Sequence, residues 1–183
     1  MRTKDITLVG LFAALMVIGA YISIPTPWVP LTFQPFFACL AGVLLGSRLG
    51  ALSQIVYVLI GLIGAPVFQG GSGGPGSILS PTFGYLIGFI IGAYVIGKIT
   101  ENRNINIKNL TVGIYCGLSI FYIFGVLYLY LILNFYLNKP INVAKALQLG
   151  FTPFIIKDLV FSGVAVIVAH KTLPALKKSG LSV

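Results

Sequence analysis

Fold and site are both decided by Phe151-Thr-Pro-Phe-Ile-Ile-Lys-Asp-Leu-Val-Phe-Ser-Gly-Val-Ala-Val-Ile-Val-Ala169. This run is almost uniformly apolar and approaches the roughly 20 residues that a helix needs to cross a bilayer. Its one acid is Asp158, and Lys157 precedes it. An ionisable side chain at membrane depth costs at least about 2.5 kcal/mol, so it usually faces a cavity and marks the path of a substrate or an ion. The run therefore predicts a membrane helix with a polar site inside it.

The composition of the chain indicates an integral membrane protein. Charged residues make up 8% and hydrophobic residues 57% of the 183 residues, whereas a soluble domain carries roughly 25% charged residues. The net charge of +9 comes without a basic cluster interleaved with aromatics, so no nucleic-acid partner is expected. Cys39 and Cys116 lie inside apolar runs and lack the spacing of a metal site or a disulfide, so we interpret both as small hydrophobes.

Apolar runs and the breakers between them predict an all-α integral membrane protein, a bundle of six transmembrane helices in a single membrane domain over residues 1–183. The expected helices are Ile6–Ile24, Phe33–Leu45, Ala51–Gly64, Phe83–Ile99, Leu110–Tyr136 and Pro153–Ala169. Several of them are shorter than a full span, which leaves room for structured loops that line a cavity rather than contact lipid.

Basic residues orient the chain in the membrane. They gather at the N-terminus, in the second and fourth connections and in the C-terminal tail. These residues are Arg2, Lys4, Arg48, Lys98, Arg103, Lys108, Lys171, Lys177 and Lys178. The positive-inside rule then predicts a multi-pass protein of the cell membrane with both termini cytoplasmic. Thr152 and Pro153 are typical of a helix N-cap and first turn, which puts Asp158 about 7 Å below the outer end of its helix.

The first outer loop, residues 23–36, carries four prolines and Trp28. Proline fixes φ and removes a donor, so a stiff, extended segment able to cap a cavity is expected. Gln34 follows at the start of the next helix, where its amide can donate and accept toward a ligand. The alternative is that Gln34 caps the helix.

The second outer loop, residues 64–85, is rich in glycine. It lacks the Lys-Ser/Thr ending of a phosphate-binding P-loop, so nucleotide binding is not expected. Its apolar flanks favour a folded lid over a flexible linker. Tyr85 at its end is either a pocket residue or an aromatic of the membrane interface.

Lys157 and Asp158 allow two interpretations. They form an ion pair that fixes helix packing, or they act as two poles of one site, because adjacent helical residues point about 100° apart. In the second case the carboxylate accepts N–H groups of a urea-like ligand, and the ammonium holds an anionic tail or steadies the acid.

Other features are weaker or missing. Gly10 and Ala14 form a small-xxx-small pattern, which suits either internal packing or the docking of a partner helix. The sequence offers no Ser/His/Asp set, no metal cluster, no second acid in the membrane and no ATP-binding motif. We therefore expect no catalytic residue, no metal and no cofactor, and any energy from ATP has to come from another chain.

A family resemblance rests on segments in both outer loops and in the last helix. They are Val29-Pro-Leu-Thr-Phe-Gln34, Gly64-Ala-Pro-Val-Phe-Gln-Gly-Gly-Ser-Gly-Gly74, Ser80-Pro-Thr-Phe-Gly-Tyr85 and Pro153-Phe-Ile-Ile-Lys-Asp158. In this order they resemble the BioY family, the biotin-binding substrate subunits (S components) of energy-coupling-factor (ECF) transporters. The resemblance covers nearly the whole chain and implies a pocket for biotin on the outer side, capped by the two loops.

The resemblance also implies roles for individual residues. Asp158 would contact the ureido ring of biotin. Further residues of the pocket would be Lys157, Gln34, Tyr85, Phe68, Ser72 and Gly73. Gly10 and Ala14 would dock the transmembrane coupling subunit, which works with an ATPase pair. The family pattern has Gly-Asp with a lysine three residues later, whereas this chain has Phe161 there. The group that holds the ligand's carboxylate is therefore left open.

Three other functions are compatible with parts of the sequence. One is an S component for a different small vitamin or amide. Another is a small intramembrane enzyme that uses Asp158 as a base, although a second catalytic group is missing. The last is a channel or scaffold, for which charge-free outer loops rich in Pro and Gly are unusual.

Overall fold

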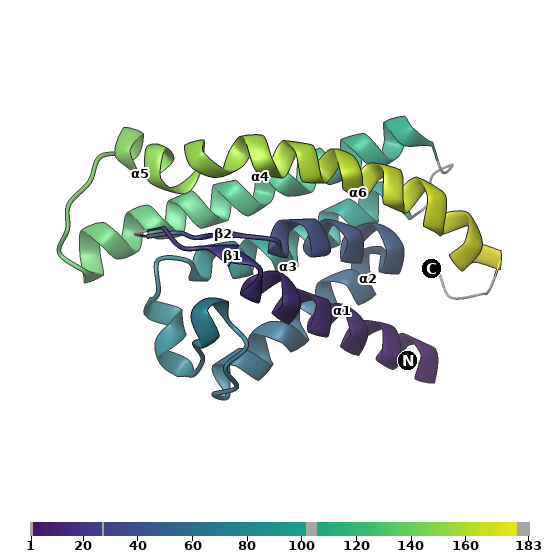
Figure 1. Ribbon diagram of the computed structural model, residues 1–183, viewed down its shortest axis with the longest axis horizontal. Coiled ribbons are helices and arrows are strands. Elements are labelled where there is room, and N and C mark those ends of the chain that lie inside the picture. The colour runs from purple at the N-terminus through teal and green to yellow at the C-terminus, as the bar shows by residue number, and fades with distance from the viewer. Residues whose placement is uncertain (1, 27, 102–105, 179–183) are drawn as a thin grey trace.

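Helices dominate the computed structural model, which describes residues 2–26, 28–101 and 106–178 (Figure 1). The longer elements are α1 (Thr3–Tyr21), α2 (Gln34–Leu62), α3 (Phe83–Thr100), α4 (Ile107–Leu131), α5 (Val143–Gly150) and α6 (Thr152–Lys178). The shorter ones are strands β1 (Ser23–Ile24) and β2 (Leu31–Thr32), the 3-10 turns η1 (Gln69–Gly71) and η2 (Pro75–Leu79), and the π-helical turn η3 (Ile132–Tyr136). The predicted all-α class is confirmed.

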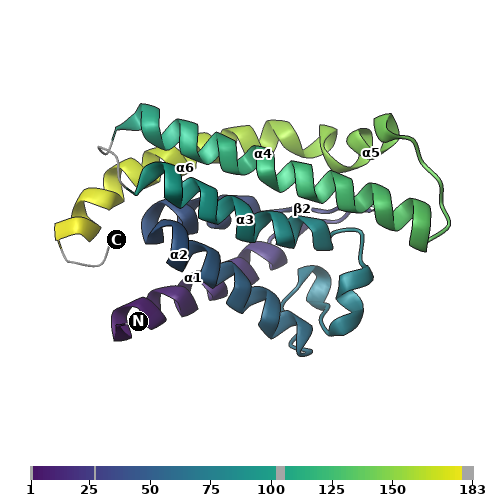
Figure 2. The same ribbon diagram turned by 180° about the vertical axis from the view of Figure 1, so that it is seen from behind.

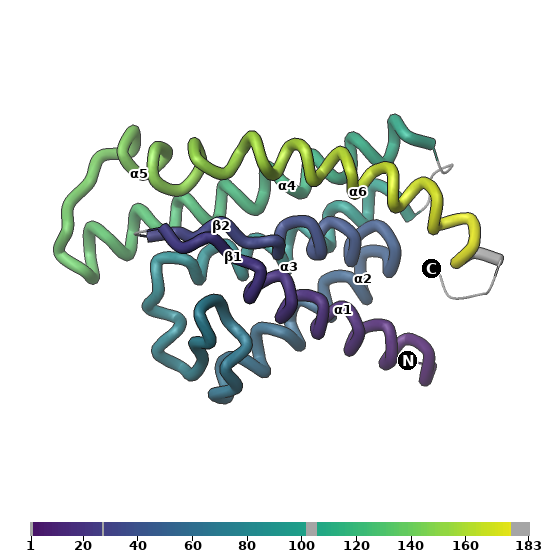
Figure 3. The backbone as a smooth tube through the Cα atoms, in the orientation of Figure 1, coloured from purple at the N-terminus to yellow at the C-terminus, as the bar shows by residue number. Residues whose placement is uncertain are grey.

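Helix α2 reverses direction at Gly46. This residue has φ 78° and ψ −179°, a conformation that glycine adopts without steric cost. A Cβ built on Gly50 would lie 3.0 Å from the Cα of Gly42, although these residues would be roughly 12 Å apart in a straight helix. Figure 3 shows the tube of α2 folding back on itself. The two halves therefore make two passes, as predicted, but the expected loop around Arg48 is wrong because a single residue makes the turn.

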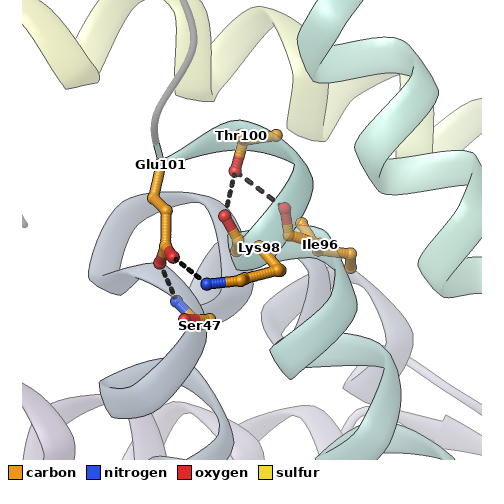
Figure 4. Close-up of polar contacts among 6 residues, drawn as sticks. Ser47, Ile96, Lys98, Thr100 and Glu101 are labelled. Atoms are coloured by element: carbon orange, nitrogen blue, oxygen red, sulfur yellow. Dashed lines mark hydrogen bonds and ion pairs between the residues drawn. The ribbon is translucent and has the colours of Figure 1, made fainter.

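The turn at Gly46 is held by the end of α3 (Figure 4). Glu101 Oε2 accepts a hydrogen bond of 2.8 Å from the backbone N–H of Ser47, and Lys98 Nζ lies 3.7 Å from Oε1. Ser47 begins the second half of α2, where backbone N–H groups lack partners within the helix. A Cβ on Gly97 would come within 2.1 Å of Ser47 N, so only glycine allows this approach. Glu101 thus caps a helix that belongs to another part of the chain.

Burial and hydrogen bonding act on Glu101 in opposite directions. Burial raises its pKa, but the hydrogen bonds from Ser47 and the charge of Lys98 outweigh burial, so the pKa lies below its usual value. The ionised carboxylate is therefore the form that the folded chain stabilises.

Several predicted boundaries are corrected by the structure. Helix α1 ends at Tyr21, before the predicted Ile24, which belongs to strand β1. Thr152 does not cap α6: it lies inside the helix, and its hydroxyl donates to Leu147 O at 3.4 Å. Helix α5 was not predicted, and α6 continues through Pro174 to Lys178. Arg103, used above to orient the chain, lies outside the described residues, as do the side chains of Lys177 and Lys178.

The outer surface of the bundle suits lipid. Five helices within the described residues are long and apolar enough to cross a membrane, and α2 makes two passes because of its reversal. Large apolar side chains point outward along them, among them Ile123 on α4 and Ile156, Val160 and Ile167 on α6. Such a surface would be exposed to water in a soluble protein, whereas in a bilayer it contacts acyl chains. The chain is therefore a multi-pass membrane protein.

The two ends of the bundle differ. Helix α1 begins and α6 ends at the same end, which we call the terminal end (Figure 1). The β1–β2 hairpin, the segment with η1 and η2, and α5 lie at the opposite end, which we call the loop end (Figures 1 and 2). The hairpin pairs Ser23 with Thr32 and Ile24 with Leu31 in antiparallel register. The two loops singled out in the sequence thus meet at one end.

The capping role of Glu101 predicts a loss of stability in Glu101→Gln of about 1 kcal/mol at neutral pH. Because the folded pKa is depressed, this stabilisation is present above the usual pKa of 4.5 and is lost as pH falls through the folded value. Thermal unfolding in detergent micelles at several pH values measures the difference between variant and parent. A difference that stays constant from neutral to acidic pH would contradict the charge-assisted cap.

Candidate functional site

A cavity of about 490 Å³ opens at the loop end. All the ligand-contact candidates from the sequence lie around it, contributed by α2, α3, α6 and the segment between α2 and α3. They are Gln34, Phe68, Ser72, Gly73, Tyr85, Lys157 and Asp158. Its size is within the range of about 300–1,000 Å³ that small-molecule sites occupy. The structure thus brings these residues together, and their contact with a ligand stays a prediction.

Asp158 is the buried acid of the cavity, with 5% of its surface exposed. Lys157 Nζ lies 2.8 Å from Oδ1, and Tyr122 Oη donates to Oδ2 at 2.5 Å. A buried charge with one partner removed is strongly destabilising, so this pairing makes the position tolerable. The expectation that Lys157 and Asp158 do not face each other is wrong, because the long lysine side chain curls back to its neighbour.

Lys157 also connects α6 to the first loop. Its Nζ donates to the carbonyl oxygen of Thr32 in β2 at 2.5 Å. The carboxylate of Asp158 is therefore neutralised from one side by a cation, while the cavity lies alongside it. The pair fixes packing, as the first interpretation requires, and it also borders a void. Its role as two poles of a ligand site stays a prediction.

Gln34 is buried at the start of α2 and does not cap it. Its Nε2 donates to Tyr57 Oη at 2.8 Å, and its Oε1 accepts from Thr32 Oγ1 at 3.4 Å. Tyr57 Oη in turn donates to Val67 O at 3.1 Å. An amide nitrogen carries two hydrogens, so Gln34 retains donor capacity for a ligand. This chain of bonds also ties the second loop to the cavity wall.

The second loop is folded, as predicted, rather than a free linker. Gly74 N donates to Gly61 O at 2.7 Å, and Gly74 has φ 92°, which favours glycine. A Cβ on Gly73 would lie 2.2 Å from Ala65 O, so no other residue fits without a shift. Phe68 N bonds to Ser72 O at 3.0 Å. These contacts hold the Phe68–Gly73 stretch against α2 at the rim of the cavity.

The first loop covers the cavity from another side. Val29 is buried, and Trp28 lines the cavity. Lys139, from the connection between η3 and α5, places its Nζ 4.8 Å from the centre of the Trp28 ring. A cation–π contact at an exposed site contributes about 0.5–1 kcal/mol. The connection between η3 and α5 therefore helps to hold the first loop in place.

Tyr85 contributes its ring rather than its hydroxyl. Its Oη donates to Gly150 O at the end of α5, at 2.6 Å. Its ring lies so close to α4 that a Cβ on Gly125 would be 2.2 Å away. Because the hydroxyl is satisfied inside the bundle, the alternative of an interfacial aromatic does not fit.

The remaining wall is apolar and comes from α3 and α4. Its members are Leu86, Phe89, Leu118 and Phe121. Within residues 2–26, 28–101 and 106–178 no group of three or more His, Cys, Asp or Glu side chains could hold a metal ion. Phe161 does not line the cavity, because its ring packs against Phe33 with 4.4 Å between centroids.

Tyr122 is the site residue that sequence reasoning missed. It lies in an aromatic-rich helix that offered no sign of a polar role, and its hydroxyl donates to Asp158. The spacing of Gly117, Phe121 and Gly125 marks a buried face of α4, which places Tyr122 beside it. No local signal pairs this tyrosine with an acid that is 36 residues later in the chain.

Comparison with known proteins agrees with the geometry. The model of the BioY family matches residues 1–178. The chain belongs to the BioY family. A biotin transporter BioY from Thermotoga maritima is 43% identical over 160 residues, covering 87% of this chain and 90% of that protein. A probable biotin transporter BioY from Pyrococcus horikoshii is 41% identical over 171 residues, covering 93% of this chain and 97% of that protein.

A solved structure shares the fold of this BioY family member. It is the crystal structure of the S-component for biotin from an ECF-type ABC transporter. The TM-score is 0.79 at 25% identity, and the match covers 93% of each chain.

The ion pair predicts a non-additive effect on stability. Lys157→Met leaves Asp158 buried with a carboxylate that lost its cation, and we expect a loss of about 3 kcal/mol in the free energy of unfolding. The double variant Lys157→Met/Asp158→Asn should lose less than this single variant, because no uncompensated charge is left. Thermal unfolding in detergent compares the three proteins. A double variant less stable than Lys157→Met would argue against the pairing.

Proposed function

We propose that the chain is the substrate-binding membrane subunit of a vitamin uptake transporter and captures biotin in the cavity at the loop end. The observation that carries this proposal is the buried carboxylate of Asp158, which is paired with Lys157 and borders a cavity with an apolar wall. Family membership and the names of the relatives, biotin transporter BioY, point to the same ligand.

The chemistry of biotin suits the walls of this cavity. Its ureido ring offers N–H groups, which a carboxylate accepts in charge-assisted hydrogen bonds. Its sulfur-containing ring and aliphatic chain are apolar and match the wall formed by Leu86, Phe89 and Leu118. In this arrangement Asp158 holds the ureido head, and Tyr122 and Lys157 position its oxygens.

Delivery across the membrane needs an ATP-driven partner, and α1 is a candidate docking surface. Gly10 and Ala14 are both exposed on α1, and a Cβ on Gly10 would meet nothing within 4 Å. This exposure disfavours the internal-packing alternative for these two residues. Small residues let a partner helix approach closely in a bilayer. We propose that this face binds the ECF transmembrane coupling subunit, which acts with the ATPase pair.

Orientation follows from charge and from the shape of the bundle. With both termini at the cytoplasmic side, the loop end and its cavity face outward, so the chain would take up biotin from the extracellular side. The whole chain, residues 1–183, would act as one membrane domain.

The alternative functions are less well supported. A different small vitamin or amide would also use Asp158, and only binding experiments separate it from biotin. An enzyme with Asp158 as a base would need a carboxylate free to take a proton, whereas Asp158 is held by Lys157 and Tyr122. Among the described residues that line the cavity no second acid is present. We therefore propose binding without catalysis.

Asp158→Asn should weaken biotin binding by about 10-fold to 100-fold, because a hydrogen bond to a charged group contributes about 1.5–3 kcal/mol. Isothermal titration of the purified protein with biotin measures this loss. Asp5→Asn, which removes an acid at the terminal end, serves as the matched control and should bind as the parent does. Normal binding by Asp158→Asn would show that the head of the ligand lies elsewhere.

Ala14→Leu should leave biotin binding unchanged and reduce uptake at least tenfold, because the larger side chain keeps a partner helix at a distance. Uptake of labelled biotin by cells that contain the coupling subunit and the ATPase pair measures the effect. Cys116→Leu enlarges another exposed small residue, on α4, and should transport normally. Full uptake by Ala14→Leu would exclude this face of α1 as the docking surface.

A further inference from the structure

Charge is concentrated at one wall of the cavity. Among the described residues that line it, Lys157 is the only cation and Asp158 the only anion. Their charged groups lie 2.8 Å apart, both on α6. The cavity is therefore neutral as a whole, and every other polar side chain that lines it is an uncharged amide, hydroxyl or indole.

The opposite wall carries hydroxyl groups. The segment between α2 and α3 contributes Ser72, Ser77, Ser80 and Thr82, which we call the hydroxyl wall. In Figures 1 and 2 this segment and α6 lie on opposite sides of the loop end, with the β1–β2 hairpin between them. Ser80 Oγ and Thr82 Oγ1 lie 2.9 Å apart, so they can act on the same group of a ligand.

Lys157 cannot serve both ends of an elongated ligand. Its Nζ is bound to the carboxylate that holds the ureido head in the proposed function, and its second bond to Thr32 O keeps it there. In biotin the carboxylate is separated from the ureido ring by the second ring and the aliphatic chain. A ligand with its head at Asp158 therefore has its tail away from Lys157 and across the cavity, toward the hydroxyl wall.

Other cations do not fill this gap. Lys139 is exposed and lies over the Trp28 ring, outside the residues that line the cavity. Position 161 carries a phenylalanine packed against Phe33 and Phe36. The hydroxyl wall itself reaches the surface, since Ser72 is exposed and Ser77 half-exposed, so a tail that ends there has space beyond it.

We propose that the tail of the ligand is recognised by the neutral hydroxyl wall and not by a cation, so that the site takes biotin amides, such as biotinyl-lysine, as well as free biotin. A hydroxyl donates and accepts, so it can pair with a carboxylate or with an amide. A cation that pairs with the carboxylate of biotin would have no partner when an amide is bound. A binding site discriminates strongly against an analogue that leaves one of its buried polar groups unpaired. This inference rests on the proposed binding of biotin.

Displacement of labelled biotin from the purified full chain tests the proposal. Biotin, biotinamide and biotinyl-lysine are compared as competitors, with a biotin analogue methylated on a ureido nitrogen as the control for the head. We expect both amides to bind within about tenfold of biotin and the head analogue to lose about 10-fold to 100-fold, as for a hydrogen bond to a charged group. Amides that bind more than about tenfold weaker than biotin would overturn the inference while leaving the proposed function intact. If biotin itself does not bind, the proposed function fails and the inference falls with it.

Two variants locate the tail. Ser77→Lys places an ammonium on the hydroxyl wall, and we expect it to increase the preference for biotin over biotinamide by about tenfold, as for a new charge-assisted contact. An unchanged preference would place the tail elsewhere and overturn the proposal. Lys139→Gln should have the same ratio of affinities for biotin and biotinamide as the parent chain. A lower ratio in Lys139→Gln would show that Lys139 binds the carboxylate of the ligand and would overturn the proposal.

Discussion

The pairing of the Asp158 carboxylate with Lys157 and Tyr122 is the interaction on which the site depends. A carboxylate in a membrane helix is costly unless it is paired, and here Lys157 contacts Oδ1 while Tyr122 donates to Oδ2. All three residues line the cavity. The charge is thus kept buried by the protein and remains next to a space that a small polar ligand can enter.

The same polar groups connect both outer loops to the bundle. Lys157 reaches Thr32 in the first loop, and Gln34 reaches the second loop through Tyr57 and Val67. Because these side chains also line the cavity, the same bonds fix the position of the two outer loops and the geometry of the polar site. Buried polar groups are costly unless they find partners, which explains why so many of these side chains bond to one another.

At the terminal end, close packing depends on glycine. Gly46 makes the reversal of α2, and Gly97 lets α3 approach it so that Glu101 can cap Ser47. The Glu101–Ser47 contact lies at the opposite end of the bundle from the cavity. It satisfies a backbone N–H group at the start of a helix, which has no partner within that helix. The short connection lets the two halves of α2 pack against each other and leaves the long connections for the loop end.

The sequence by itself determined the membrane location, the all-α class and the two structured loops, because hydropathy, proline and glycine are local signals. The isolated charge of Asp158 singled out the candidate site. The family resemblance added the biotin pocket and its candidate residues. Only the tertiary structure decided that Tyr122 binds Asp158, that Lys157 turns back to its neighbour, that Tyr85 gives its hydroxyl to Gly150 and that Glu101 caps Ser47. Except for the Lys157–Asp158 contact, these bonds join residues more than 35 positions apart, and the Lys157 contact depends on a flexible side chain. Their partners are chosen by how helices pack, and no local pattern in the chain encodes that choice.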